Sequence, residues 1–212
     1  MDERLSFIGE HKVFGVIRAD TMEQALVAAR AMHRGGLRLI EVTFSVAEAA
    51  QVISLLREEL TRSLIGAGTV LEMAQARAAA EARADFIFAP DTNPEVVRFA
   101  KERGVLACPG AATPTEVTAA LRLGADIVKV FPAGWLGGPA YVRALHELLP
   151  EARLVPTGGV SAANAAEYLA AGAFAVGIGA TMFPRQTLAA GDMEAIERAA
   201  RDAVAAVGSR QG

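Results

Sequence analysis

The sequence lacks several features that would mark particular classes of protein. Cys108 is the only cysteine in 212 residues, so no intrachain disulfide can form. No apolar run approaches the roughly 18 residues of a membrane-spanning helix, and the opening MDERLSFIGEHKV lacks the apolar core of a signal peptide. The net charge of −3 comes without a long run of either sign, which argues against nucleic-acid and membrane partners. We therefore expect a soluble cytoplasmic protein.

Metal ligands are also scarce. His11, His33 and His146 are scattered along the chain, none of them ends an apolar run, and there is only one cysteine to join them. Metal sites need several such ligands brought together, so we expect none. Lysine is rare too, because the chain has only three against 18 arginines. A lysine in an unusual place therefore needs an explanation.

What the sequence does contain is 52% hydrophobic residues, enough for a sizeable core. Short apolar runs, nearly continuous and rich in Val, Ile and Phe, are typical of strands covered on both faces of a parallel sheet. They recur evenly, with room for one helix between each pair. The predicted strands are 12–18, 37–44, 63–70, 85–90, 105–110, 127–132, 153–159 and 174–179.

The segments between these runs carry helix-capping signals. Thr21 has Gln24 three residues later, and Thr113 has Glu116 at the same spacing, as in a capping box. A weaker example runs from 161 to 172. Right-handed crossovers would close eight such units into an α/β fold, a single (β/α)8 barrel domain over residues 1–212. An open doubly wound sheet is the rival, but eight even repeats without a long crossover favour the barrel.

Lys129 is the sharpest functional signal, because it lies amid Ile, Val and Phe in a predicted strand. Burying an ammonium is costly, so the side chain either reaches the surface, pairs with Glu41, or serves as a neutral amine nucleophile. Arginine could not serve in that last role. Glu41 lies on one face of another predicted strand. It is either an ion-pair partner of Arg38 or Lys129, or a general acid/base.

Glycines follow the last two predicted strands, where barrels commonly bind phosphate through backbone N–H groups. They are Gly158, Gly159, Gly177 and Gly179. The alternative is that they serve tight turns that need glycine only for its backbone freedom. Their occurrence after both strands favours phosphate.

Six segments, in this order and at this spacing, resemble the 2-keto-3-deoxy-6-phosphogluconate (KDPG) aldolase family. They are RLIEVTF, LIGAGTVL, ACPGAATPTE, IVKVFPA, VPTGGVS and AVGIGATMF, within residues 13–184. The family also includes 4-hydroxy-2-oxoglutarate (KHG) and phosphogalactonate aldolases. The resemblance implies a (β/α)8 class I aldolase, usually a homotrimer, with no metal or other cofactor. Its substrate would be a small 2-oxo acid, cleaved to pyruvate and glyceraldehyde 3-phosphate or glyoxylate.

The resemblance also implies roles for single residues. Lys129 would form the Schiff base and Glu41 would be the acid/base. The implied substrate-binding residues are Thr69, Pro90, Phe131 and Thr157, and we add Arg18 and Ser45 to this predicted set. The implied phosphate-binding residues are Gly158, Gly159 and Gly179, and we add Gly177 and Ala180 to that set.

Two positions depart from the family pattern. Ser45 stands where some members have an arginine that binds the substrate carboxylate, and we expect Arg18 to take over that task. Ala180 stands where many members have a serine that bonds phosphate. The loss of that hydroxyl points to weaker phosphate binding or to non-phosphorylated 4-hydroxy-2-oxo acids.

Two other functions fit a phosphate-binding barrel. One is an isomerase or synthase for ribulose or thiazole phosphates, in which Lys129 would act only electrostatically. The other is a catalytically silent barrel that senses sugar phosphates. Trapping of an imine at Lys129 separates both from an aldolase.

Overall fold

The computed structural model describes residues 2–182 and 185–208. Residues 183 and 184, at the end of the stretch that carries the resemblance, lie outside them. The strands are β1 (Val13–Ile17), β2 (Leu39–Thr43), β3 (Leu64–Gly68), β4 (Phe86–Phe88), β5 (Leu106–Cys108), β6 (Gly110–Ala111), β7 (Val128–Val130), β8 (Leu154–Pro156) and β9 (Val176–Ile178). The helices are α1 (Glu3–His11), α2 (Met22–Arg34), α3 (Ala49–Glu59), α4 (Met73–Glu81), α5 (Pro94–Glu102), α6 (Pro114–Arg122), α7 (Gly138–Leu148), α8 (Ala165–Ala170), α9 (Arg185–Ala189) and α10 (Met193–Gly208).

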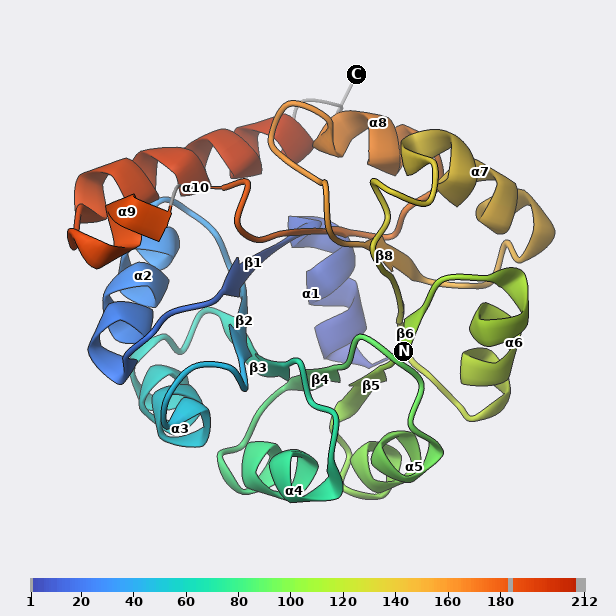
Figure 1. Ribbon diagram of the computed structural model, residues 1–212, viewed down its shortest axis with the longest axis horizontal. Helices are drawn as coiled ribbons and strands as arrows, with labels where there is room; N and C mark the ends of the chain where they lie inside the picture. The colour runs from blue at the N-terminus through green and yellow to red at the C-terminus, as the bar shows by residue number, and fades with distance from the viewer. Residues whose placement is uncertain (1, 183–184, 209–212) are drawn as a thin grey trace.

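All paired strands are parallel, and the sheet curls inside a ring of helices (Figure 1). Six strands form one sheet in the order β5-β4-β3-β2-β1-β9, and three form a second in the order β6-β7-β8. A single bridge between Thr157 and Gly177 links β8 to β9. This is an α/β fold, as the alternation of apolar runs and capped segments predicts.

Each predicted run contains a strand, although the strands are shorter than predicted. The fifth run differs most, because the structure ends β5 at Cys108 and begins β6 at Gly110. Pro109 lies between them and has no N–H to give to a ladder, which accounts for the break. Its carbonyl still accepts from the Lys129 N–H at 2.8 Å.

Two of the three predicted helix starts are confirmed. The Thr21 hydroxyl accepts from the Gln24 N–H, and Thr113 forms a full capping box with Glu116. The third prediction, a helix from 161 to 172, is wrong in its start. The helix begins at Ala165, and the Asn164 side chain accepts from the Ser161 N–H instead.

The inside of the curled sheet is filled by large apolar side chains at its amino-terminal end. The rings of Phe14, Phe86 and Phe88 meet edge to face, with centroids 5.1 to 5.4 Å apart. Helix α1 crosses the ring of strands (Figure 1), and its Leu5 and Ile8 join the same cluster. This packing closes one end and leaves the carboxyl ends of the strands as the end where a ligand can enter.

Gly66 leaves space for this aromatic cluster, since a Cβ there would overlap the Phe86 ring. We expect Gly66→Ala to lower the free energy of unfolding by about 1–3 kcal/mol, the usual cost of overpacking a core. Urea unfolding followed by circular dichroism measures the change. Gly208→Ala, where a Cβ would meet nothing within 4 Å, is the matched control. Equal stability of the two variants would contradict this account of the core.

Candidate active site

Lys129 and Glu41 meet inside the curled sheet. Lys129 is the middle residue of β7 and Glu41 the middle residue of β2, and they are only 3% and 1% exposed. The Lys129 Nζ donates to Glu41 Oε1 over 3.4 Å. The alternative in which Lys129 reaches the surface is therefore wrong. Glu41 pairs with Lys129 and not with Arg38, whose guanidinium donates to the carbonyl of His33 at 2.7 Å.

Aromatic rings and a glycine shape the space around this pair. The Nζ of Lys129 lies 5.4 Å from the centroid of Phe88 and 5.7 Å from that of Phe131, within the range of a cation–π attraction. Beside Glu41, a Cβ at Gly68 would overlap the carboxylate. Gly68 therefore leaves room for the Glu41 carboxylate. A larger residue at position 68 of β3 would force that carboxylate to move.

Thr69 follows directly after β3 in a strained conformation. Its φ of 56° is in the left-handed region, which β-branched residues rarely adopt. Such strain persists where the surroundings hold it, often at functional sites. Here the Thr69 hydroxyl accepts from Arg18 Nη2 at 3.2 Å. The structure thus brings together two of the predicted carboxylate-binding residues, which are 51 positions apart in the chain.

A chain of hydroxyls fixes Ser45. Thr43 Oγ1 donates to the carbonyl of Ile17 at 2.9 Å and lies 2.7 Å from Ser45 Oγ. Since Thr43 has one hydrogen and the carbonyl can only accept it, Ser45 must donate to Thr43. Ser45 keeps only acceptor lone pairs for a ligand. It cannot donate to a substrate carboxylate while this chain of bonds is intact.

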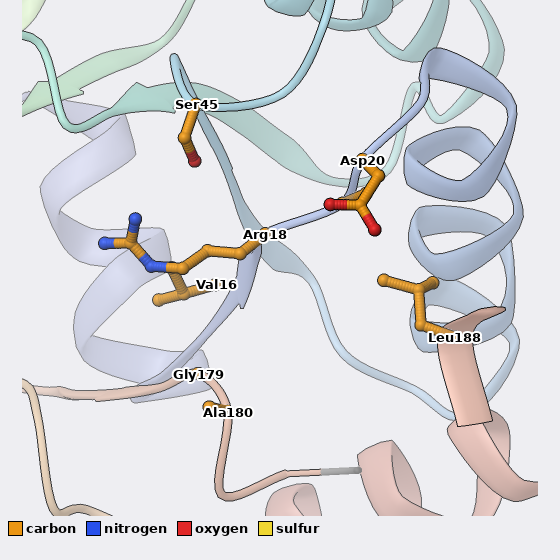
Figure 2. A pocket seen from close by; sticks show the side chains of 8 residues that line it. Val16, Arg18, Asp20, Ser45, Gly179, Ala180 and Leu188 are labelled. Carbon is orange, nitrogen blue, oxygen red and sulfur yellow. The ribbon is translucent and has the colours of Figure 1, made fainter. Parts of the chain in front are cut away.

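A cavity of about 460 Å³ opens at the carboxyl ends of β1, β2 and β9 (Figure 2). Its lining residues are Val16, Arg18, Ala19, Asp20, Ser45, Gly179, Ala180 and Leu188. It joins Arg18 and Ser45 with Gly179 and Ala180 from the predicted phosphate-binding set. Sequence reasoning missed Asp20 and Leu188. Asp20 could have been predicted, because it follows Arg18, the last residue of a predicted strand, by two positions. No feature of the sequence around Leu188 predicts that it lines a cavity.

The four glycines of the predicted phosphate site are of two kinds. Gly158 and Gly159 have φ of 85° and 81°, so their backbone freedom is required there. Gly177 and Gly179 have no positive φ, and the turn explanation does not apply to them. A Cβ at Gly177 would instead overlap the Thr157 hydroxyl, so this glycine makes room for the 7% exposed Thr157.

Pro90 and Phe131 lie at a second cavity. It has a volume of about 360 Å³ and is also lined by Gly110 and Glu116. Phe131 is shared between this cavity and the surroundings of Lys129. The predicted substrate-binding residues therefore do not all line one cavity, and among those in the described chain Phe131 is the one within cation–π range of Lys129.

Among residues 2–182 and 185–208, no three His, Cys, Asp or Glu side chains are placed to hold a metal ion. Cys108 is buried in the interior cluster, and burial raises the pKa of its thiol well above the usual value. Within the described chain, no helix is both long and apolar enough to span a membrane.

Comparisons with known proteins point to one family. The model of the KDPG and KHG aldolase family matches residues 5–199. A 2-dehydro-3-deoxy-phosphogluconate aldolase from Treponema pallidum (strain Nichols) is 40% identical over 197 residues, covering 93% of this chain and 94% of its own. A KHG/KDPG aldolase from Escherichia coli (strain K12) is 33% identical over 192 residues, covering 91% and 90%.

A solved structure is also similar. It is a KDPG aldolase from Legionella pneumophila with pyruvate captured at low pH as a covalent carbinolamine intermediate. It has a TM-score of 0.85 and 28% identity, and the match covers 93% of this chain and 96% of that one. Sequence and structure agree over nearly the whole length, and the chain belongs to the KDPG and KHG aldolase family.

Proposed function

We propose that this protein is a class I aldolase that reversibly cleaves 4-hydroxy-2-oxo acids to pyruvate and an aldehyde. The substrates would be 2-dehydro-3-deoxy-6-phosphogluconate, 4-hydroxy-2-oxoglutarate, or both. Family membership supports a carbon–carbon lyase. The observation that carries the mechanism is the buried contact of 3.4 Å between Lys129 Nζ and Glu41 Oε1. It places an amine and a carboxylate in one water-poor site, as imine chemistry requires.

In the proposed reaction the neutral amine of Lys129 attacks the C2 carbonyl, and loss of water gives a protonated imine. Glu41 takes the proton of the C4 hydroxyl, directly or through a water. The C3–C4 bond then breaks, its electron pair moves into the imine to form an enamine, and the aldehyde leaves. Protonation at C3 and hydrolysis of the imine release pyruvate and restore Lys129. The carbinolamine of the Legionella pneumophila relative is the kind of adduct that the first step forms.

The proposed carboxylate site is Thr69 with Arg18. The hydrogen bond between them shows that both groups reach one place, and a guanidinium binds a carboxylate well. The sequence also predicts Ser45 as a substrate-binding residue, but its hydroxyl offers only lone pairs and does not suit a carboxylate. Pro90, Phe131 and Thr157 would enclose the pyruvyl half.

The proposed phosphate site lies at the loops after β8 and β9. Its residues would be Gly158, Gly159, Gly177, Gly179 and Ala180. Gly179 and Ala180 line the larger cavity, which supports them most directly. Gly177 lies within β9, so we expect it to act through the space that it gives Thr157.

The wider proposal is a single closed (β/α)8 barrel over residues 1–212 that needs no metal or other cofactor. Closure is supported by the bridge from Thr157 to Gly177 and by the bond from the Lys129 N–H to the Pro109 carbonyl. A cytoplasmic homotrimer remains part of the proposal, on the strength of the family resemblance.

Incubation with pyruvate and borohydride tests the imine. We expect one pyruvate-derived adduct, found at Lys129 by mass spectrometry of peptides, and no aldolase activity in Lys129→Arg, because arginine cannot form the imine. Lys101→Arg is the control, since Lys101 pairs with Asp126 at the surface. An unmodified Lys129 in active protein would sink the mechanism and favour an isomerase, a synthase or a silent sensor.

The acid–base role of Glu41 is tested by replacing Glu41 itself and by replacing Gly68, which lies beside its carboxylate. Glu41→Gln should lower kcat by about 10²- to 10⁴-fold, the usual contribution of acid–base catalysis, while Lys129 remains present to be trapped. Gly68→Ala, which forces the carboxylate to move, should lower kcat by about 100-fold. Steady-state kinetics with coupled detection of pyruvate measures both. Full activity in Gly68→Ala would show that the position of this carboxylate does not matter.

The role of metals is tested by removal. Extended dialysis against a chelator should leave kcat and KM unchanged, because the lysine imine supplies the electron sink that a metal would otherwise provide. The released metal content is measured in parallel. Loss of activity that added zinc or magnesium restores would contradict the proposal.

A further inference from the structure

Three successive carbonyl groups in the loop after β8, those of residues 158–160, all accept hydrogen bonds. The Gly134 N–H donates to the first at 2.8 Å, Asn164 Nδ2 donates to the second at 3.0 Å, and the Thr181 hydroxyl donates to the third. Gly134 lies in the loop after β7, Asn164 directly before α8, and Thr181 in the loop after β9. Three different segments therefore fix the backbone of this one loop.

Fixing these carbonyls also fixes the N–H groups of the loop. In a trans peptide the carbonyl of one residue and the N–H of the next share a rigid plane and point in opposite directions. The bond to the Gly158 carbonyl thus orients the Gly159 N–H, and the bond to the Gly159 carbonyl orients the Val160 N–H. Within the part of the chain that the structure describes, no group accepts from either N–H. Both are therefore available to a ligand.

The N–H of Val160 is the more telling of the two. Val160 is only 1% exposed, and a buried backbone N–H that no protein group accepts is rare. Such a group needs an acceptor from outside the chain, and the oxygens of an anion suit it. The loop thus presents two neighbouring donors, and one of them strongly favours a bound acceptor.

The Asn164 amide can lie in only one orientation. Its Oδ1 accepts from the Ser161 N–H at 2.8 Å while its Nδ2 donates to the Gly159 carbonyl. A backbone N–H only donates and a carbonyl only accepts, so exchanging the two amide atoms would lose both bonds. The Ser161 N–H shares its peptide plane with the Val160 carbonyl, which accepts from Thr181. Thr181 therefore orients Asn164, and Asn164 orients the Val160 N–H.

Thr181 itself is not suited to bind an anion. Its hydroxyl has one hydrogen, which it gives to the Val160 carbonyl, so only lone pairs remain. Ala180, directly before it, has no hydroxyl to offer. At this end of the site, oriented backbone N–H groups have to supply donors that side chains do not.

The loop is connected to the surroundings of Lys129 through Phe131. A Cβ at Gly158 would lie 3.2 Å from the Phe131 ring, so the loop backbone packs against that ring. The centroid of the same ring lies 5.7 Å from Lys129 Nζ. The ring borders both the amine and the loop, and we expect the phosphate end of a substrate bound to Lys129 on this side of the lysine.

We propose that Asn164 and Thr181 are positioning residues that orient the N–H groups of Gly159 and Val160 toward the phosphate of the substrate. The inference rests on the proposed aldolase function. It adds to the phosphate site of that function two residues that do not themselves touch the phosphate. It also predicts that this site reads a phosphate in spite of the alanine at position 180.

Two substrates that differ only in the phosphate isolate the effect of the loop. They are 2-dehydro-3-deoxy-6-phosphogluconate and the same acid without its phosphate. Thr181→Val keeps the shape of the side chain and removes the hydroxyl. We expect it to raise KM for the phosphorylated substrate about tenfold with kcat unchanged, because binding that is equal in ground and transition states is lost. Both constants for the other substrate should stay at their wild-type values.

Two control variants accompany Thr181→Val. Thr181→Ser keeps the hydroxyl and should restore the wild-type KM for the phosphorylated substrate. Thr115→Val removes a hydroxyl from an exposed threonine of α6 and should match the wild type with both substrates. Trapping of pyruvate at Lys129 by borohydride, which needs no phosphate, is measured in all variants and should be equal in them.

Asn164→Ala tests whether the two residues act in series. It removes both bonds of the amide and should give the same rise in KM for the phosphorylated substrate alone. In the double variant Thr181→Val/Asn164→Ala the rise should be no greater than that of the larger single variant, because both residues act on one peptide plane. A rise equal to the product of the two single effects would show that Thr181 acts independently of Asn164.

The outcomes separate this inference from the function on which it rests. An equal rise in KM for both substrates in Thr181→Val, no rise in either, or no rescue by Thr181→Ser overturns the positioning role. If pyruvate and borohydride still modify Lys129 in these preparations, the aldolase function stands. If wild-type Lys129 is not modified and neither substrate is cleaved, the aldolase function fails and the positioning role fails with it.

Discussion

The contact between Lys129 and Glu41 imposes the strongest constraint on this structure. Each of these ions costs several kcal/mol to remove from water, and only close pairing with well-placed neighbours offsets that cost. The surrounding residues meet this demand. Phe88 and Phe131 present ring faces to the ammonium, and Gly68 leaves the carboxylate its space. The same arrangement buries both side chains almost completely.

The fold places Lys129 and Glu41 between the apolar amino-terminal end of the curled sheet and its open carboxyl end. Apolar rings and helix α1 fill the amino-terminal end of the curled sheet, so the polar residues lie one step nearer the open end. Strand alternation sets which residues point inward. Glu41 and Thr43 share one parity in β2, and each takes part in a contact inside the sheet or at its mouth. The site is therefore a direct outcome of where each strand ends.

The sequence was sufficient to predict the parallel strands and two of the helix caps, and it included the pairing of Lys129 with Glu41 among its alternatives. These depend on local patterns and on strand parity, which a single sequence records. The left-handed Thr69, the break at Pro109 and the orientation of the Ser45 hydroxyl were not predicted. The setting of Thr69 and the orientation of Ser45 involve groups distant in the chain, since Thr69 accepts a hydrogen bond from Arg18 and the Ile17 carbonyl sets the direction of the hydroxyl chain. The break at Pro109 follows instead from the missing N–H of proline, a local property that the single predicted run over 105–110 did not use.

The division into two sheets has a consequence for the reacting groups. Glu41 belongs to the six-stranded sheet and Lys129 to the three-stranded one. The two sheets meet at Pro109 on one side and at the bridge from Thr157 to Gly177 on the other. The amine and the carboxylate thus lie on strands of different sheets, and their separation depends on the contacts across these two seams. The ladder within either sheet does not by itself determine the spacing of the pair, since neither ladder contains both strands.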